Sequence, residues 1–131
     1  MNARPEVAMR EFLFLAALVF TGSLTAVGQD PVKVDPDHFK VVFENDQVRV
    51  LRSIIGPHEK NPMHEHPATV IISLTDVDGV HTLPDKKTKE LHTKAGEARW
   101  SAPTRHAYEN LTDNTSEAIL VELKARPAKP Q

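Results

Sequence analysis

The 131-residue chain contains no cysteine. This absence excludes disulfide bonds and any chemistry that needs a thiolate. An excess of either charge is also missing, because 18 acidic residues nearly balance 16 Lys and Arg, and no basic stripe stands out. Nucleic acid is therefore not an expected partner. The length indicates a single domain.

Long apolar runs are absent except near the N-terminus, where residues 12–20 follow Arg4 and Arg10. This run is about half of the roughly 20 apolar residues that a membrane span needs. The small residues Ala26 and Gly28 fit a signal-peptidase cut before Gln29. We interpret residues 1–28 as a signal peptide and expect a secreted or periplasmic protein that leaves the membrane once the signal is removed. A retained N-terminal anchor is the alternative.

The remaining chain has no long stretch with a helical period. Residues 29–37 contain two prolines and predict an extended linker, and the Pro-rich residues 125–131 predict a disordered tail. Between them, residues 38–124 alternate short apolar runs with turn signals. The predicted strands are 38–43, 47–55, 69–74, 80–83, 88–93, 97–101, 106–111 and 117–123. This pattern is typical of an all-β antiparallel sandwich or barrel.

Histidine is concentrated in this part of the chain, which carries all seven. The segment Pro62-Met63-His64-Glu65-His66-Pro67 holds two of them at alternate positions. In a strand, His64 and His66 would project from one face while Glu65 faces away. Both imidazoles could then reach one ion at about 2.1 Å. A surface-exposed pair is the alternative interpretation.

His106 provides a third ligand, and with it the chain resembles the cupin superfamily. Cupins carry a first motif with Gly, then His-x-His, a Glu soon after and a later Gly, and a second motif with Pro-x-Gly, a further His and then Asn four residues on. The matching positions are Gly56, His64, His66 and Gly79 for the first motif, and Gly96, His106 and Asn110 for the second. The resemblance covers roughly residues 41–123.

The resemblance implies an antiparallel jelly-roll barrel with a metal site formed by His64, His66 and His106. The chain departs from the usual pattern at three points. The first-motif Glu should fall near Val70 or Ile71, and both are apolar. The Pro-x-Gly before the last His reads Ser101-Ala102-Pro103, and the Gly-to-His spacing of the first motif is longer than usual. The chain thus resembles a three-His variant without the motif Glu. The implied cofactor is one divalent ion, namely Fe, Zn, Ni, Mn or Cu, and ligand identity does not choose among them.

The function implied is a metal-dependent enzyme of oxygenase or isomerase type that acts on a small anionic metabolite. A non-catalytic module that binds a small molecule or a metal is the main alternative, and a barrel with a lost site is a third. No general base is evident, because Glu65 and Glu109 alternate away from the ligands, and catalytic residues stay unassigned. The resemblance also implies pairing into a homodimer, in which the exposed first strand joins a neighbouring sheet.

The other histidines are predicted to have no role in the metal site. His58 lies in the loop before His64, where a solvated side chain is favoured over an extra ligand. His81 and His92 fall on opposite limbs of a predicted hairpin, and we expect them to be cross-strand partners at the surface.

The remaining polar and aromatic candidates are few. Arg99 and Arg105 could meet an anionic substrate, but exposure is the favoured prediction for both. Tyr108 shares a face with His106 and is expected in the core, where it could also line a pocket. Trp100 is the one tryptophan, and we expect it to pack inside.

Overall fold

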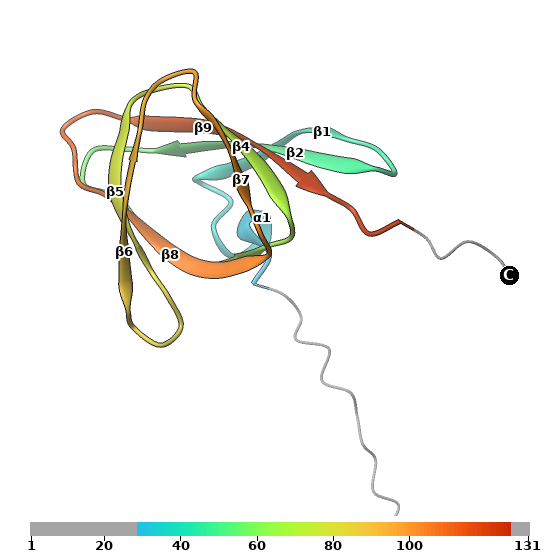
Figure 1. Ribbon diagram of the computed structural model, residues 1–131, viewed down its shortest axis with the longest axis horizontal. Helices are drawn as coiled ribbons and strands as arrows, with labels where there is room; N and C mark the ends of the chain where they lie inside the picture. The colour runs from blue at the N-terminus through green and yellow to red at the C-terminus, as the bar shows by residue number, and fades with distance from the viewer. Residues whose placement is uncertain (1–28, 127–131) are drawn as a thin grey trace, which may run out of the picture.

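The computed structural model describes residues 29–126, so the predicted signal peptide and residues 127–131 of the tail lie outside the described residues. Two antiparallel sheets face each other (Figure 1). A five-stranded sheet has the order β1-β2-β9-β4-β7, and a four-stranded sheet has the order β3-β8-β5-β6. The elements are α1 (Pro31–Val34), β1 (Phe39–Glu44), β2 (Val48–Ile55), β3 (Lys60–His66), β4 (Thr69–Ser73), β5 (Val77–Thr82), β6 (Thr88–Thr93), β7 (Ala98–Ser101), β8 (Thr104–Asn110) and β9 (Ser116–Leu123). The prediction of one all-β antiparallel jelly-roll barrel is confirmed.

The interior between the sheets is unusually polar. Two small apolar clusters lie there, one of Phe39, Leu51 and Leu120 and one of Ile55, Val77 and Tyr108. Against these six buried hydrophobic residues, the described part of the chain buries eleven polar or charged ones. Buried polar groups need hydrogen-bond partners. An interior with this many of them is typical of a ligand-binding site and not of a purely apolar core.

The strand β3, which carries His64 and His66, was not among the strands predicted from the sequence. β3 is rich in polar residues and contains Pro62, so it lacks a β-branched run such as that of β4. It pairs with β8, and the register shifts between Asn61 and His64, on either side of the proline that cannot donate to the ladder. The Asn61 side-chain oxygen accepts a hydrogen bond from the Tyr108 amide and bridges this irregular stretch.

The prediction that residues 29–37 form an extended linker is wrong for residues 31–34, which form the single-turn helix α1. The Asp30 side chain accepts hydrogen bonds from the amides of Val32 and Lys33, and Pro31 occupies the first helical turn. Proline is favoured there because its missing N–H would be unpaired anyway. The helix packs against β3 and β1, so this segment is part of the domain.

The motif residue Asn110 is a structural anchor. Its side chain is fully buried, and its amide donates to the carbonyls of Ile55, Gly56 and Asn114. The side-chain oxygen accepts from the amide and hydroxyl of Thr112. These bonds tie the end of β2 to the turn after β8, and they hold the strand that carries His106.

The outer face of the five-stranded sheet is partly apolar. Trp100 lies there on β7 and is 59% exposed, so the prediction that it packs inside is wrong. It is the register partner of Val70 on β4, which in turn pairs with Val121 on β9. In the described residues, no helix is both long and apolar enough to cross a membrane.

Candidate metal centre

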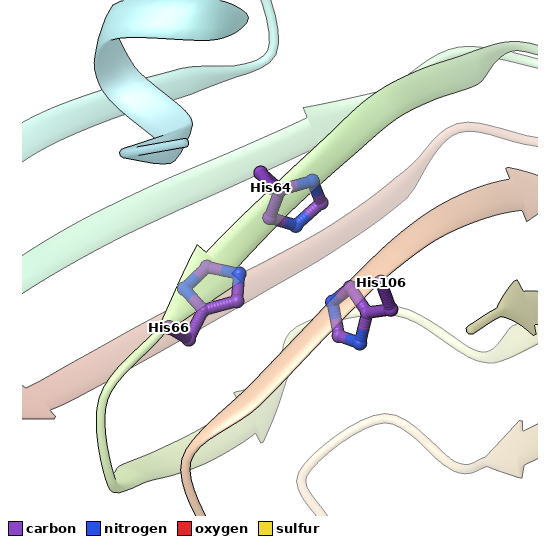
Figure 2. Close-up of side chains that lie close together, drawn as sticks. All are labelled: His64, His66 and His106. Carbon is purple, nitrogen blue, oxygen red and sulfur yellow. The ribbon is translucent and has the colours of Figure 1, made fainter. Parts of the chain in front are cut away.

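Two neighbouring strands bring the three predicted ligands together. His64 and His66 project from one face of β3, and His106 of β8 is the register partner of His64. Figure 2 shows the three rings grouped over these strands. The ring centroid of His106 lies 4.9 Å from that of His64 and 5.6 Å from that of His66, and the β3 pair is 4.7 Å apart. All three side chains are buried, so a surface-exposed His pair is excluded.

Hydrogen bonds fix which nitrogen of the β3 histidines faces the centre. The Nδ1 of His64 lies 2.8 Å from the Pro62 carbonyl, and the Nδ1 of His66 lies 2.8 Å from Glu122 Oε1. A carbonyl and a carboxylate can only accept, so each Nδ1 carries the hydrogen and donates. In the neutral ring Nε2 then keeps its lone pair, which is the form that binds a metal.

The donor set fits a divalent ion. One ring nitrogen from each histidine lies within 4.8 Å of the others. Two nitrogens bound to one ion at about 2.1 Å are at most about 4.2 Å apart, so small rotations of the rings would complete such a site. The three histidines could therefore hold a metal ion, and its identity is not determined by imidazole alone.

Burial keeps two of these rings uncharged. It lowers the pKa of His64 to about 4, despite the opposing hydrogen bond to Pro62, and it lowers the pKa of His106 to about 2. The neighbouring histidines lower both further by charge repulsion. At neutral pH these rings are thus ready to bind a metal without first losing a proton.

The carboxylate that sequence reasoning missed is Glu122 of β9. It is 1% exposed and accepts hydrogen bonds from His66 on one oxygen and from Arg49 on the other, at 2.7 Å. Arg49 also forms an ion pair with Asp30, just before α1. Glu122 is thus directed at the far nitrogen of His66 and orients this ligand from behind. Arg49 and Glu122 are cross-strand neighbours of opposite charge in the structure. The sequence did not reveal that Glu122 points inward, because both faces of β9 carry apolar residues.

A cavity of about 70 Å³ adjoins the histidines between the two sheets. The ring of His81 stacks on His106 at 4.1 Å, and its register partner is Lys89 rather than His92. The prediction that His81 is a surface partner of His92 is therefore wrong. Burial lowers the pKa of His81 to about 4.

The other candidates divide between the cavity and the surface. Tyr108 and Arg99 line the cavity, so the favoured prediction of an exposed Arg99 is wrong. Arg105 is exposed and donates to the Gln29 side chain. His58 is also exposed and lies 2.6 Å from Asp113, away from the three ligands.

Comparisons with known proteins agree with this architecture. No family model matches the chain, and no curated protein matches it. Among solved structures, a cupin domain from Bordetella pertussis Tohama I superposes with a TM-score of 0.62 at 19% identity, over 66% of this chain and 92% of that one. The chain has the cupin fold.

Two further solved structures are similar to the chain. A Klebsiella pneumoniae protein with a double-stranded β-helix domain gives a TM-score of 0.53 at 18% identity, over 67% of this chain and 84% of that one. The polyketide cyclase RemF from Streptomyces resistomycificus gives 0.50 at 21% identity, over 68% and 66%. Identities this low establish the fold alone, so the function of this chain must be argued from its own site.

Replacing Glu122 should weaken metal binding. We expect Glu122→Gln to lower metal affinity about 10- to 100-fold, because the neutral amide is a weaker acceptor for His66 Nδ1–H. Competition against a chelator of known affinity measures this. Glu117→Gln is the matched control, since Glu117 lies on the same strand but pairs with Arg52 at the surface. Equal affinities for the two variants would show that Glu122 does not support the ligand.

The metal-stripped protein should lose stability as the pH falls from about 6.5 to about 4. In this window His64 binds a proton in the unfolded chain but not in the folded one, which favours unfolding. The pKa of His64 lies about 2.5 below its ordinary value, so the neutral ring contributes roughly 3 kcal/mol to the free energy of unfolding at neutral pH. Denaturant titrations at several pH values measure the slope, and His64→Asn should make it shallower, while His81 and His106, whose pKa values burial also lowers, keep part of it.

His38 acts in the opposite direction and serves as a control. Burial lowers its pKa, but hydrogen bonds to Asp35 and Glu59 outweigh this and raise the pKa above its ordinary value. Its contribution is therefore complete at low pH and is lost as the pH rises, so His38→Asn should not flatten the acid slope. An unchanged slope in His64→Asn would contradict the assignment to the buried ring.

Proposed function

We propose that this exported cupin binds one divalent metal ion through His64, His66 and His106 and uses it to act on a small anionic metabolite. The observation that carries the proposal is the convergence of three buried imidazoles, two of them held in the metal-binding tautomer. Three neutral ligands contribute no negative charge and leave positions open for a further ligand. A bound ion would polarise an oxygen of the substrate or lower the pKa of a water.

The protein groups around the site support binding and orientation more clearly than proton transfer. Glu65 and Glu109 point away from the ligands, in agreement with their alternation in the sequence, since only the alternate positions of β3 and β8 are buried. Glu122 is occupied by Arg49 and His66. An oxygenase or isomerase reaction, in which the ion itself activates the substrate, therefore suits this cavity better than general-base hydrolysis.

Natively purified protein should contain close to one equivalent of a divalent metal. We expect His64→Ala and His106→Ala each to lose most of it, because two imidazoles bind far more weakly than three. Elemental analysis measures this, with circular dichroism to verify folding. His92→Ala is the control, since His92 is exposed and pairs with Asp78 and Glu90 on the hairpin. Full metal retention by the folded His106→Ala protein would refute the three-histidine site.

The alternative function is a binding module without turnover. Oxygen uptake or product formation by the metal-loaded protein with small carboxylates and diketones would support the enzyme. Stabilisation by the same compounds without any turnover would support the module.

We also propose that the chain is exported and cut before Gln29. Expression in a host with a secretory pathway should yield a mature protein whose N-terminus begins at or near residue 29. N-terminal sequencing of protein recovered outside the cytoplasm checks the site. Uncut chain that stays with the membrane fraction would instead support the retained anchor.

A further inference from the structure

Arg99 presents an unbalanced positive charge to the cavity beside the histidines. It lies on β7 opposite Ile71 of β4, on the inward face of the edge strand. Its Nε is buried and has no hydrogen-bond partner among the described residues. Arg49 and Arg52, by contrast, each contact a carboxylate at 2.8 Å or less.

No counter-ion for Arg99 lines the cavity. Among the residues that line it, Arg99 is the only arginine, and Asp, Glu and Lys do not occur. The nearest buried carboxylate to the ligands, Glu122, is already paired with Arg49. Burial lowers the pKa of Arg99, and proximity to Tyr108 offsets this only in part. A guanidinium whose Nε is buried without an acceptor is costly unless an anion supplies one.

Tyr108 adds a second unused polar group to the same cavity. Its hydroxyl is buried near Ser116 but has no hydrogen bond of normal geometry within the described residues. Gly79 of β5 makes room for this ring, because a Cβ at that position would overlap the Tyr108 ring and hydroxyl. The phenol is therefore placed by its neighbours, while its hydrogen-bonding capacity is left for something else.

Size and shape restrict the ligand. The cavity of about 70 Å³ is far smaller than the roughly 300–1,000 Å³ of pockets that enclose drug-sized ligands, so it suits a small molecule. The planar guanidinium matches a carboxylate with two parallel hydrogen bonds. An imidazole-bound cation at the other side would accept a second oxygen of the same molecule.

We propose that Arg99, with Tyr108 beside it, binds the carboxylate of a short-chain oxo- or hydroxycarboxylate whose second oxygen faces the three histidines. This assignment rests on the proposed metal-dependent function and specifies its substrate class. Arg99 is the residue that selects a carboxylate over a neutral analogue of the same size. Tyr108 donates to the same carboxylate or to the adjacent oxygen.

The test measures binding and does not depend on turnover. Pyruvate and lactate are titrated into wild-type protein by calorimetry, with metal bound and with metal removed, and lactamide serves as the neutral analogue. We expect carboxylate binding at millimolar concentrations or below, tighter with metal, and much weaker binding of lactamide. Arg99→Gln should weaken carboxylate binding about 10- to 100-fold and leave metal content unchanged.

Two controls separate ligand recognition from a structural role. Arg105→Gln, on β8, should bind the carboxylates like wild type, because Arg105 is exposed and contacts only the Gln29 side chain. Arg99→Met keeps a long side chain without the charge, and the ligand-free variant should melt at the same temperature as wild type or higher. A structural role for Arg99 would lower the melting temperature instead.

The possible failures are distinct. If wild-type protein holds no metal, the proposed function fails, whatever the carboxylates do. If metal is bound but pyruvate and lactate do not bind at millimolar concentrations, or bind equally to wild type and Arg99→Gln, only the assignment of Arg99 is overturned. Equal affinity for lactate and lactamide would overturn it as well.

Discussion

The site depends on the buried carboxylate of Glu122 and the two partners that share it. One oxygen accepts from His66 Nδ1 and the other from Arg49, so both acceptor sides of the carboxylate are used inside the barrel. A buried charge is tolerated only when it is paired and hydrogen-bonded in this way. Because Arg49 also reaches Asp30, one chain of contacts links the metal ligand on β3 through β9 and β2 to the start of α1.

This arrangement also determines the charge of the cavity. In a site with a carboxylate ligand, the ion would be partly neutralised by its own donor. Here the buried carboxylate of Glu122 lies behind His66 and is balanced by Arg49, so the cavity side keeps the three imidazoles and Arg99. Positive charge from an ion and from a guanidinium would then act on the same small volume, where the low dielectric strengthens the attraction for an anion. The absence of the motif Glu and the presence of Arg99 thus have the same effect, because both leave the cavity more positive.

The sequence predicted the parts of this protein that follow from local pattern. Alternation placed His64 and His66 on one face, and the resemblance to cupins placed His106 opposite them. The sequence-based predictions were wrong or incomplete where packing between distant segments determines the structure. β3 has a polar, Pro-containing sequence, so its strand form comes from pairing with β8 and not from propensity. Arg99 and Trp100 occupy adjacent positions of one edge strand, and only the sheet's orientation shows that the arginine is inward and the tryptophan outward.

The segment before the barrel takes part in the site in a way that its composition did not indicate. The Gln29 carbonyl accepts from the Glu65 amide at 2.7 Å, between the two β3 ligands, and its side chain accepts from Arg105 of β8. Asp30 caps α1 and pairs with Arg49, which in turn holds Glu122. A cut before Gln29 keeps every one of these contacts, whereas a cut two residues later removes both Gln29 and Asp30. If the chain is cut at the proposed site, its first residues would support His66 within the candidate metal centre, although none of them is among the three candidate ligands.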